Sequence, residues 1–165
     1  MGKLILAIDQ GTTATTVLLI DSELNVVAKA SNEILPTYPS YGWVEHDLDK
    51  IWEGTRKTIQ DVLGYRSSAE IAAISITNQR ETVGVWERAT GRPLHHAIVW
   101  QCRRTAARCE ELRLQPGLNE TIKKTTGLVI DPYFSATKME WLLQNVPGLP
   151  EKARSGEAIF GNIDT

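Results

Sequence analysis

Cysteine is scarce in this sequence, which contains only Cys102 and Cys109. The two residues are seven positions apart in a helical pattern, which places them on one helix face about 10 Å from each other. That separation is too large for an undistorted disulfide. The spacing is not that of a CxxC pair, and without a second pair of ligands a structural zinc site is not favoured. We therefore expect two small, buried side chains without redox or metal chemistry.

The sequence also lacks an excess of charge of one sign and any long hydrophobic run. The formal net charge is −2, with acids and bases interspersed, which argues against nucleic-acid and membrane partners.

The longest apolar run, residues 4–8, is far too short to cross a bilayer. The N-terminus lacks the apolar stretch and cleavage site of a signal peptide. Hydrophobic residues make up 42% of the chain and charged residues 23%, which is usual for soluble globular proteins. These features favour a cytoplasmic protein.

No internal repeat and no low-complexity linker is visible, so the sequence predicts one continuous α/β segment. Its start is rich in strands, because apolar and β-branched residues predict strands at 3–9, 14–21 and 26–30 in a three-stranded meander. Asp47 is a suitable N-cap for a helix over 48–63, and Gly64 is a suitable stop.

Strands and helices alternate in the rest of the chain. A buried strand is predicted at 71–77, and a hairpin with strands at 83–87 and 94–100 follows it. The next helix has an apolar stripe made of Cys102, Ala106, Cys109 and Leu112. Ser135 can cap another helix, and a last strand is expected at 157–164. The pattern predicts an α/β fold with a mixed β-sheet flanked by helices. Because the chain stops at the end of an apolar strand, we expect it to be part of a longer protein.

The turn at residues 9–13, Asp-Gln-Gly-Thr-Thr, lies between two predicted strands. Gly11 allows a tight turn whose amides can surround an anion. Thr12 and Thr13 add hydroxyl donors, and Asp9 can hold a magnesium ion directly or through water. The segment is neither a P-loop nor a GxGxxG fingerprint. A nucleotide site and a plain hairpin turn capped by threonines both remain open.

Three later segments place polar or aromatic side chains after predicted strands or before helices. Arg80 and Glu81 together suit a ligand with neighbouring hydroxyl groups, although an ordinary surface ion pair is the simpler interpretation. Trp100 suits the apolar wall of a ligand site or a core position. Tyr133, on a loop before a helix, is open to a ligand role or a core role. Arg104, near a helix start, is expected on an exposed basic face.

Taken in this order, the segments resemble the N-terminal part of glycerol kinases, which belong to the carbohydrate kinases with an actin-like, ribonuclease-H-like ATPase fold. The matching stretches are AIDQGTT at 7–13, GWVEHD at 42–47, ITNQRET at 76–82, AIVWQCRRTA at 97–106, TGLVIDPYFSATK at 126–138 and FGNIDT at 160–165. The first of them marks the wide superfamily, whereas NQRE, WQCRR and DPYFS are specific for glycerol as the substrate.

The resemblance implies a role for each matching position. Asp9 would belong to the Mg²⁺ and phosphate site. ATP phosphates would be bound by the turn at Gly11, Thr12, Thr13 and Ala14, and Thr12 would also contact the substrate. Glycerol would be bound by Arg80, Glu81 and Tyr133, with Trp100 packed on its carbon chain. Family members often have a serine at position 14 and an arginine at position 16, where this chain has Ala14 and Thr16. A backbone contact at position 14 would survive this change, whereas a hydroxyl contact would not.

The resemblance also implies that residues 1–165 form the N-terminal part of the first lobe of a two-lobe kinase, so that this lobe is incomplete here. The catalytic aspartate of such kinases comes from a later segment, so no catalytic residue is expected in this chain and the chain alone is expected to be inactive. A kinase for another polyol or sugar and a non-catalytic actin-like ATP-binding module remain alternatives. A homo-oligomer stays compatible with the sequence.

Overall fold

The computed structural model describes residues 3–165, and the chain forms two compact units. Unit 1 contains the residues up to Pro36 together with Asp47–Gln79 and Ile163–Thr165. Unit 2 contains Thr37–His46 and Arg80–Asn162. Each unit has its own four-stranded sheet. The prediction of one continuous segment with one sheet was therefore incomplete, because the chain leaves unit 1 and returns to it without a recognisable linker.

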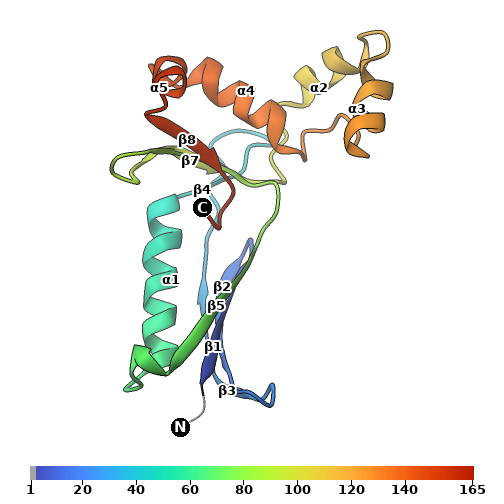
Figure 1. Cartoon of the computed structure of the whole chain (residues 1–165). Helices are drawn as coiled ribbons and strands as arrows, with labels where there is room; N and C mark the ends of the chain where they lie inside the picture. Colours follow the sequence, from blue (N-terminus) through green and yellow to red (C-terminus); the bar gives the residue numbers. More distant parts are fainter. Residues whose placement is uncertain (1–2) are drawn as a thin grey trace. The chain divides into compact units, whose positions relative to one another are not determined.

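Unit 1 is a mixed sheet with a long helix on one face (Figure 1). The sheet order is β3-β2-β1-β5, with β1 antiparallel to β2 and parallel to β5. The elements are β1 (Leu4–Gln10), β2 (Ala14–Ile20), β3 (Val26–Glu33), α1 (Leu48–Leu63), a 3₁₀ turn at Ser68–Glu70 and β5 (Ile71–Asn78). The predicted meander and the bounds of the long helix are confirmed.

The core of unit 1 follows from the alternation of side chains along its strands. In β1 the inward positions are Leu4, Leu6 and Ile8, and they pack with Val17 and Leu19 of β2 and with Val62 of α1. Helix α1 begins as predicted, since the Asp47 carboxylate accepts hydrogen bonds from the amides of Asp49 and Lys50. It ends where Gly64 takes a left-handed φ of 55°, which a residue without a Cβ adopts readily.

Strand β5 differs from the prediction, because it is exposed along most of its length. It lies at one edge of the sheet, and α1 packs mainly over β2 and β3. Ile74 and Ile76 pair with the inward positions Leu6 and Ile8 of β1, yet their side chains are 62% and 51% exposed. An apolar run predicts the strand, but it does not reveal whether a helix covers that strand.

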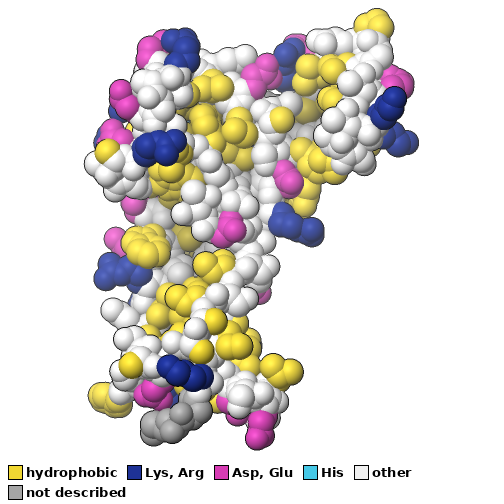
Figure 2. All heavy atoms as spheres, in the orientation of Figure 1, with side chains coloured by type: hydrophobic (Ala, Val, Ile, Leu, Met, Phe, Trp, Pro, Cys, Tyr) yellow, Lys and Arg dark blue, Asp and Glu magenta, His cyan; other side chains and the backbone are white. Residues whose placement is uncertain are grey.

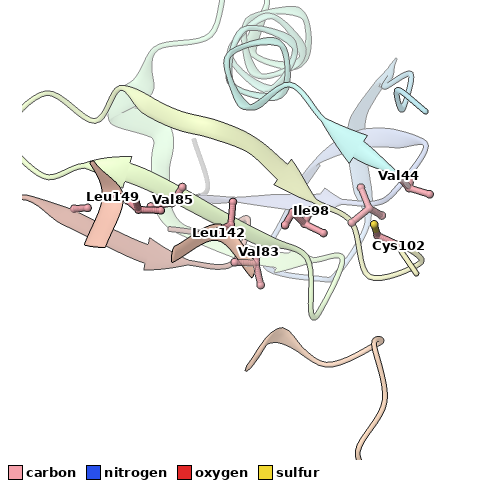
Figure 3. Packing of buried hydrophobic residues seen from close by; sticks show 9 residues of the cluster. Val44, Val83, Val85, Ile98, Cys102, Leu142 and Leu149 are labelled. Atoms are coloured by element: carbon pink, nitrogen blue, oxygen red, sulfur yellow. The ribbon is translucent and has the colours of Figure 1, made fainter. Parts of the chain in front are cut away.

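Unit 2 is an antiparallel sheet with the order β4-β7-β6-β8, and the last two helices of the unit pack against it (Figure 1). Its elements are β4 (Glu45–His46), β6 (Val83–Glu87), β7 (Pro93–Ile98), α2 (Ala106–Arg113), α3 (Leu118–Thr126), α4 (Ser135–Asn145), α5 (Leu149–Ser155) and β8 (Ala158–Gly161). Figure 3 shows the core side chains, among them Val83 and Val85 of β6 with Leu142 of α4. The predicted hairpin of β6 and β7 is confirmed, and β8 is shorter than predicted.

Two expectations around α2 need correction. Cys102 precedes the helix instead of lying on it, because its amide closes a turn onto the carbonyl of Val99 at 2.9 Å. Both cysteines are nevertheless free and buried, as predicted. Arg104 is not on an exposed face, since its side chain is fully buried and pairs with Glu45. Its guanidinium lies 4.0 Å and 4.5 Å from two tryptophan ring centroids, those of Trp43 and Trp141.

Charged side chains of both signs are interspersed over the visible face (Figure 2), in agreement with the balanced composition. Among residues 3–165, no helix is long and apolar enough to cross a membrane.

Leu18 and Leu19 lie on opposite faces of β2 and form a matched pair for testing the core of unit 1. Leu19 is fully buried, whereas Leu18 is only partly covered. We predict that Leu19→Ala lowers the free energy of unfolding by about 2–5 kcal/mol, through lost burial and the cavity left behind. Leu18→Ala should cost about half as much or less. Urea unfolding followed by circular dichroism measures both values, and equal losses would contradict the assigned inward face.

Candidate functional site

The turn between β1 and β2 is closed by a hydrogen bond from the Gly11 amide to the Ala14 carbonyl, 2.9 Å long. A Cβ on Gly11 would lie 3.0 Å from that same oxygen, which is too close for a side chain. Gly11 does not have a positive φ, so its backbone conformation does not require glycine. The requirement for glycine comes instead from the Ala14 carbonyl oxygen, which lies close to the position that a Cβ would occupy. Its amide is used inside the turn, so an anion there would need other donors, such as the amide and hydroxyl of Thr13.

Two buried glutamines hold this turn in place. The Gln10 amide group donates to the Gly11 carbonyl at 3.2 Å, and its Oε1 accepts from Thr15 at 2.7 Å and Thr55 at 3.1 Å. Gln79 donates to the same Gly11 carbonyl at 3.2 Å, and its backbone amide donates to the Gln10 carbonyl at 2.7 Å. Sequence reasoning missed the supporting role of both. The sequence feature that could have indicated this role is Gln10, a polar residue at an inward position of β1.

Asp9 and Thr13 are the exposed members of the turn. Within residues 3–165, the Asp9 carboxylate makes no hydrogen bond or ion pair, and the Thr13 amide and hydroxyl donate to no other residue. Thr12 and Ala14 are half-buried. No group of three or more potential metal-ligating side chains (His, Cys, Asp, Glu) exists in the described part of the chain. A cation at Asp9 would take its other ligands from phosphate and water, as Mg²⁺ commonly does.

The second group of predicted residues lies in unit 2, where Glu81 is fixed by the start of α4. One carboxylate oxygen of Glu81, Oε2, accepts from the Ser135 amide at 3.0 Å and from the Ser135 hydroxyl at 2.6 Å. Glu81 therefore caps α4 from a distant part of the sequence. The expectation that Ser135 is the N-cap was wrong, because it is the first helical residue and Phe134 holds the cap position. A negative group at a helix N-terminus is favourable.

Trp100 and Tyr133 lie beside each other in unit 2. Their ring centroids are 5.7 Å apart with an interplanar angle of 63°. The Trp100 amide donates to the Thr82 hydroxyl at 3.2 Å, and the Tyr133 amide donates to Asp131 at 2.8 Å. Both side chains are only partly covered, so each presents part of its ring to solvent. The structure thus brings these two residues together, as a shared ligand wall requires.

Arg80 is exposed and forms no hydrogen bond or ion pair with any other residue of the described range 3–165. It does not pair with its neighbour Glu81, whose carboxylate is engaged with Ser135. The simpler interpretation of these residues as a surface ion pair is therefore wrong. Arg80 instead offers an unused fork of donors beside a fixed carboxylate.

Lys138 is the residue of this region that sequence reasoning overlooked. Its side chain is fully buried in α4, where the helical pattern alone predicts an apolar residue. The ammonium donates to the Glu81 carbonyl at 2.9 Å and to the Tyr133 carbonyl. One side chain therefore connects the backbones of two predicted ligand residues.

Burial lowers the pKa of the Lys138 ammonium to about 8, while the charge of Glu81 offsets part of the shift. The unfolded chain keeps the ordinary lysine pKa of 10.5, so between these pH values the unfolded state binds more protons than the folded state. We predict that the stability of the wild type relative to Lys138→Met rises over this range, by at most about 1.4 kcal/mol per pH unit. It should level off at lower pH. Urea unfolding of both proteins across pH measures this difference, and a falling difference would contradict the prediction.

Known proteins resemble the chain over nearly its whole length. The glycerol kinase of Aeromonas hydrophila is 53% identical over 166 residues, which cover 99% of this chain and 33% of that protein. The crystal structure of Plasmodium falciparum glycerol kinase with ADP matches with a TM-score of 0.90 at 36% identity, covering 99% of this chain and 33% of that one. Gluconate kinase from Lactobacillus acidophilus shares the fold, with a TM-score of 0.83 at 23% identity, over 99% of this chain and 32% of that one. The chain spans about a third of the length of these relatives.

The match to a whole protein family agrees with these individual relatives. The model of the N-terminal domain of the FGGY carbohydrate kinases matches residues 4–165. The mixed α/β fold predicted from the sequence is confirmed by the solved kinases that share it. A family match over almost every residue, together with half-identical relatives, leads to one conclusion: the chain belongs to the FGGY family of carbohydrate kinases.

Proposed function

We propose that this chain is the N-terminal part of a glycerol kinase, which transfers a phosphoryl group from ATP to glycerol and forms sn-glycerol 3-phosphate. The observation that carries the proposal lies in unit 2, where Lys138 joins Glu81 to Tyr133 and the Tyr133 ring lies beside Trp100, with Arg80 next to Glu81 in the chain. Arg80 offers donors that no other described residue uses, and Glu81 offers a carboxylate that is held in place. Neighbouring hydroxyl groups each donate and accept hydrogen bonds, so a small polyol is the ligand class that suits this pair.

The aromatic pair supplies the apolar side of such a site. Trp100 and Tyr133 have adjacent, partly exposed rings, against which the carbon chain of glycerol would pack. Three carbons offer little apolar area, so the hydrogen bonds of Arg80 and Glu81 would provide most of the specificity. The glycerol kinases that are half-identical to this chain support glycerol among the polyols.

The turn of unit 1 would take the nucleotide phosphates. Thr13 has an unused amide and an exposed hydroxyl, and Asp9 has an exposed, unpaired carboxylate, so the residues present fit a phosphate with an accompanying Mg²⁺. Thr12 and the backbone at Ala14 would complete the phosphate contacts. Bound Mg-ATP would supply the phosphoryl group and the neutralising charge that this type of transfer needs.

The catalytic base would come from the part of the protein that follows this chain. In phosphoryl transfer to an alcohol, a carboxylate near the nucleophile accepts the hydroxyl proton. Glu81 is a poor candidate, because its Oε2 already accepts two hydrogen bonds from Ser135. The 165-residue chain alone should therefore release no ADP in response to glycerol.

Arg80→Ala tests this function in the complete protein that contains this chain. We predict that the KM for glycerol rises about 10- to 100-fold, because one charged hydrogen-bond donor is worth about 1.5–3 kcal/mol. The KM for Mg-ATP should change little. Coupled-enzyme measurement of ADP release, with a panel of polyols as acceptors, gives both values.

Arg56→Ala is the matched control, since Arg56 is an exposed arginine on α1 without a partner among residues 3–165. It should leave both constants unchanged. If the protein phosphorylates another polyol in preference to glycerol, that polyol is the substrate in place of glycerol. ADP release that depends on no polyol would contradict the proposal.

A further inference from the structure

Glu81 has a backbone conformation that needs an explanation. Its φ is 64°, and among residues 3–165 only one other non-glycine residue, Leu24, has a positive φ. Leu24 lies in an exposed turn, where such a conformation is common. For a residue with a side chain, the left-handed region costs about 1 kcal/mol or more, and it persists where surrounding contacts hold it.

Lys138 supplies such a contact. Its ammonium donates to the Glu81 carbonyl at 2.9 Å and to the Tyr133 carbonyl, and no part of its side chain is exposed. Burying a charged group is costly, and a positive charge in the first turns of a helix opposes the helix dipole. Neither burial nor helix stability accounts for a lysine at this position of α4.

The same helix also fixes the side chain of Glu81. Ser135, three positions before Lys138, holds Oε2 of the carboxylate with its amide and hydroxyl. The second oxygen, Oε1, accepts no hydrogen bond within the described range 3–165. Lys138 therefore fixes the backbone of Glu81 and Ser135 fixes its side chain, which leaves Oε1 as the carboxylate oxygen available to a ligand.

We propose that Lys138 is a positioning residue for the polyol site, because it holds the loops that present Glu81 and Tyr133 in the arrangement that binds substrate. The inference rests on the proposed function, since it assigns substrate contacts to these two residues. The hydrogen bonds of the Lys138 ammonium go to the backbone carbonyls of these two residues and not to their side chains. Its loss would displace both contacts together, and displacement of such contacts by about 1 Å can reduce activity about 100-fold.

Kinetics of Lys138→Met in the complete protein test the proposal, because methionine keeps the length of the side chain and removes its donors. We expect the KM for glycerol to rise about 10-fold or more, with a KM for Mg-ATP within about 2-fold of the wild type. Lys152→Met is the matched control, since Lys152 binds Glu87 at 3.0 Å and contacts neither substrate loop. It should leave both constants unchanged.

A double-mutant cycle separates positioning from general stability. If Lys138 acts through Glu81 and Tyr133, then Lys138→Met should reduce kcat/KM less in a Glu81→Gln background than in the wild type. Fully additive losses, or a lower Tm with an unchanged KM for glycerol, would overturn the proposal. If the methionine variant does not fold, Lys138→Gln takes its place and is judged by the same two criteria.

The two proposals can fail separately in this experiment. If the wild type phosphorylates another polyol and not glycerol, the proposed function is wrong, and the cycle is repeated with that acceptor. If the wild type phosphorylates glycerol and Lys138→Met binds it normally, the function stands and the positioning role is overturned.

Discussion

A buried ammonium bound to two backbone carbonyls is the interaction on which the proposed polyol site of this chain depends. Lys138 connects the segment after β5, the loop before α4 and α4 itself. Without those bonds, both carbonyls would lose a charged donor, and a hydrogen bond to a charged group is worth about 1.5–3 kcal/mol. The left-handed backbone of Glu81 would then lose the contact that holds it. The proposed arrangement of Glu81 and Tyr133 therefore depends on contacts made by the first turns of α4.

Both units follow the same construction principle. In unit 1 the buried Gln10 fixes a turn whose exposed members are Asp9 and Thr13. In unit 2 the buried Lys138 fixes Glu81, beside the exposed Arg80. In each case a buried, hydrogen-bonded side chain holds a segment whose neighbouring exposed groups keep unused donors or acceptors. Such preorganisation lowers the entropy that ligand binding would otherwise cost.

The sequence predicted the features that depend on residues close together in the chain. The bounds of α1 follow from the Asp47 cap and the helical period, and the pairing of β1 with β2 follows from alternation and a short turn. It could not predict contacts between distant segments. The capping of α4 by Glu81 joins residues 54 positions apart, and the exposure of Ile76 depends on where α1 packs. The ligand roles proposed for Arg80, Glu81, Trp100 and Tyr133 come from resemblance to a family, and the geometry of these residues came only from the fold.

The most direct test of this account is a crystal structure of the complete protein with glycerol bound. We predict that glycerol hydroxyls bind the Arg80 guanidinium and the Oε1 atom of Glu81. Oε2 should keep its bonds to Ser135, and the Lys138 ammonium should keep both carbonyl partners. Glycerol bound elsewhere, or Glu81 released from Ser135 to reach it, would contradict the claim that α4 prepares the site before the substrate arrives.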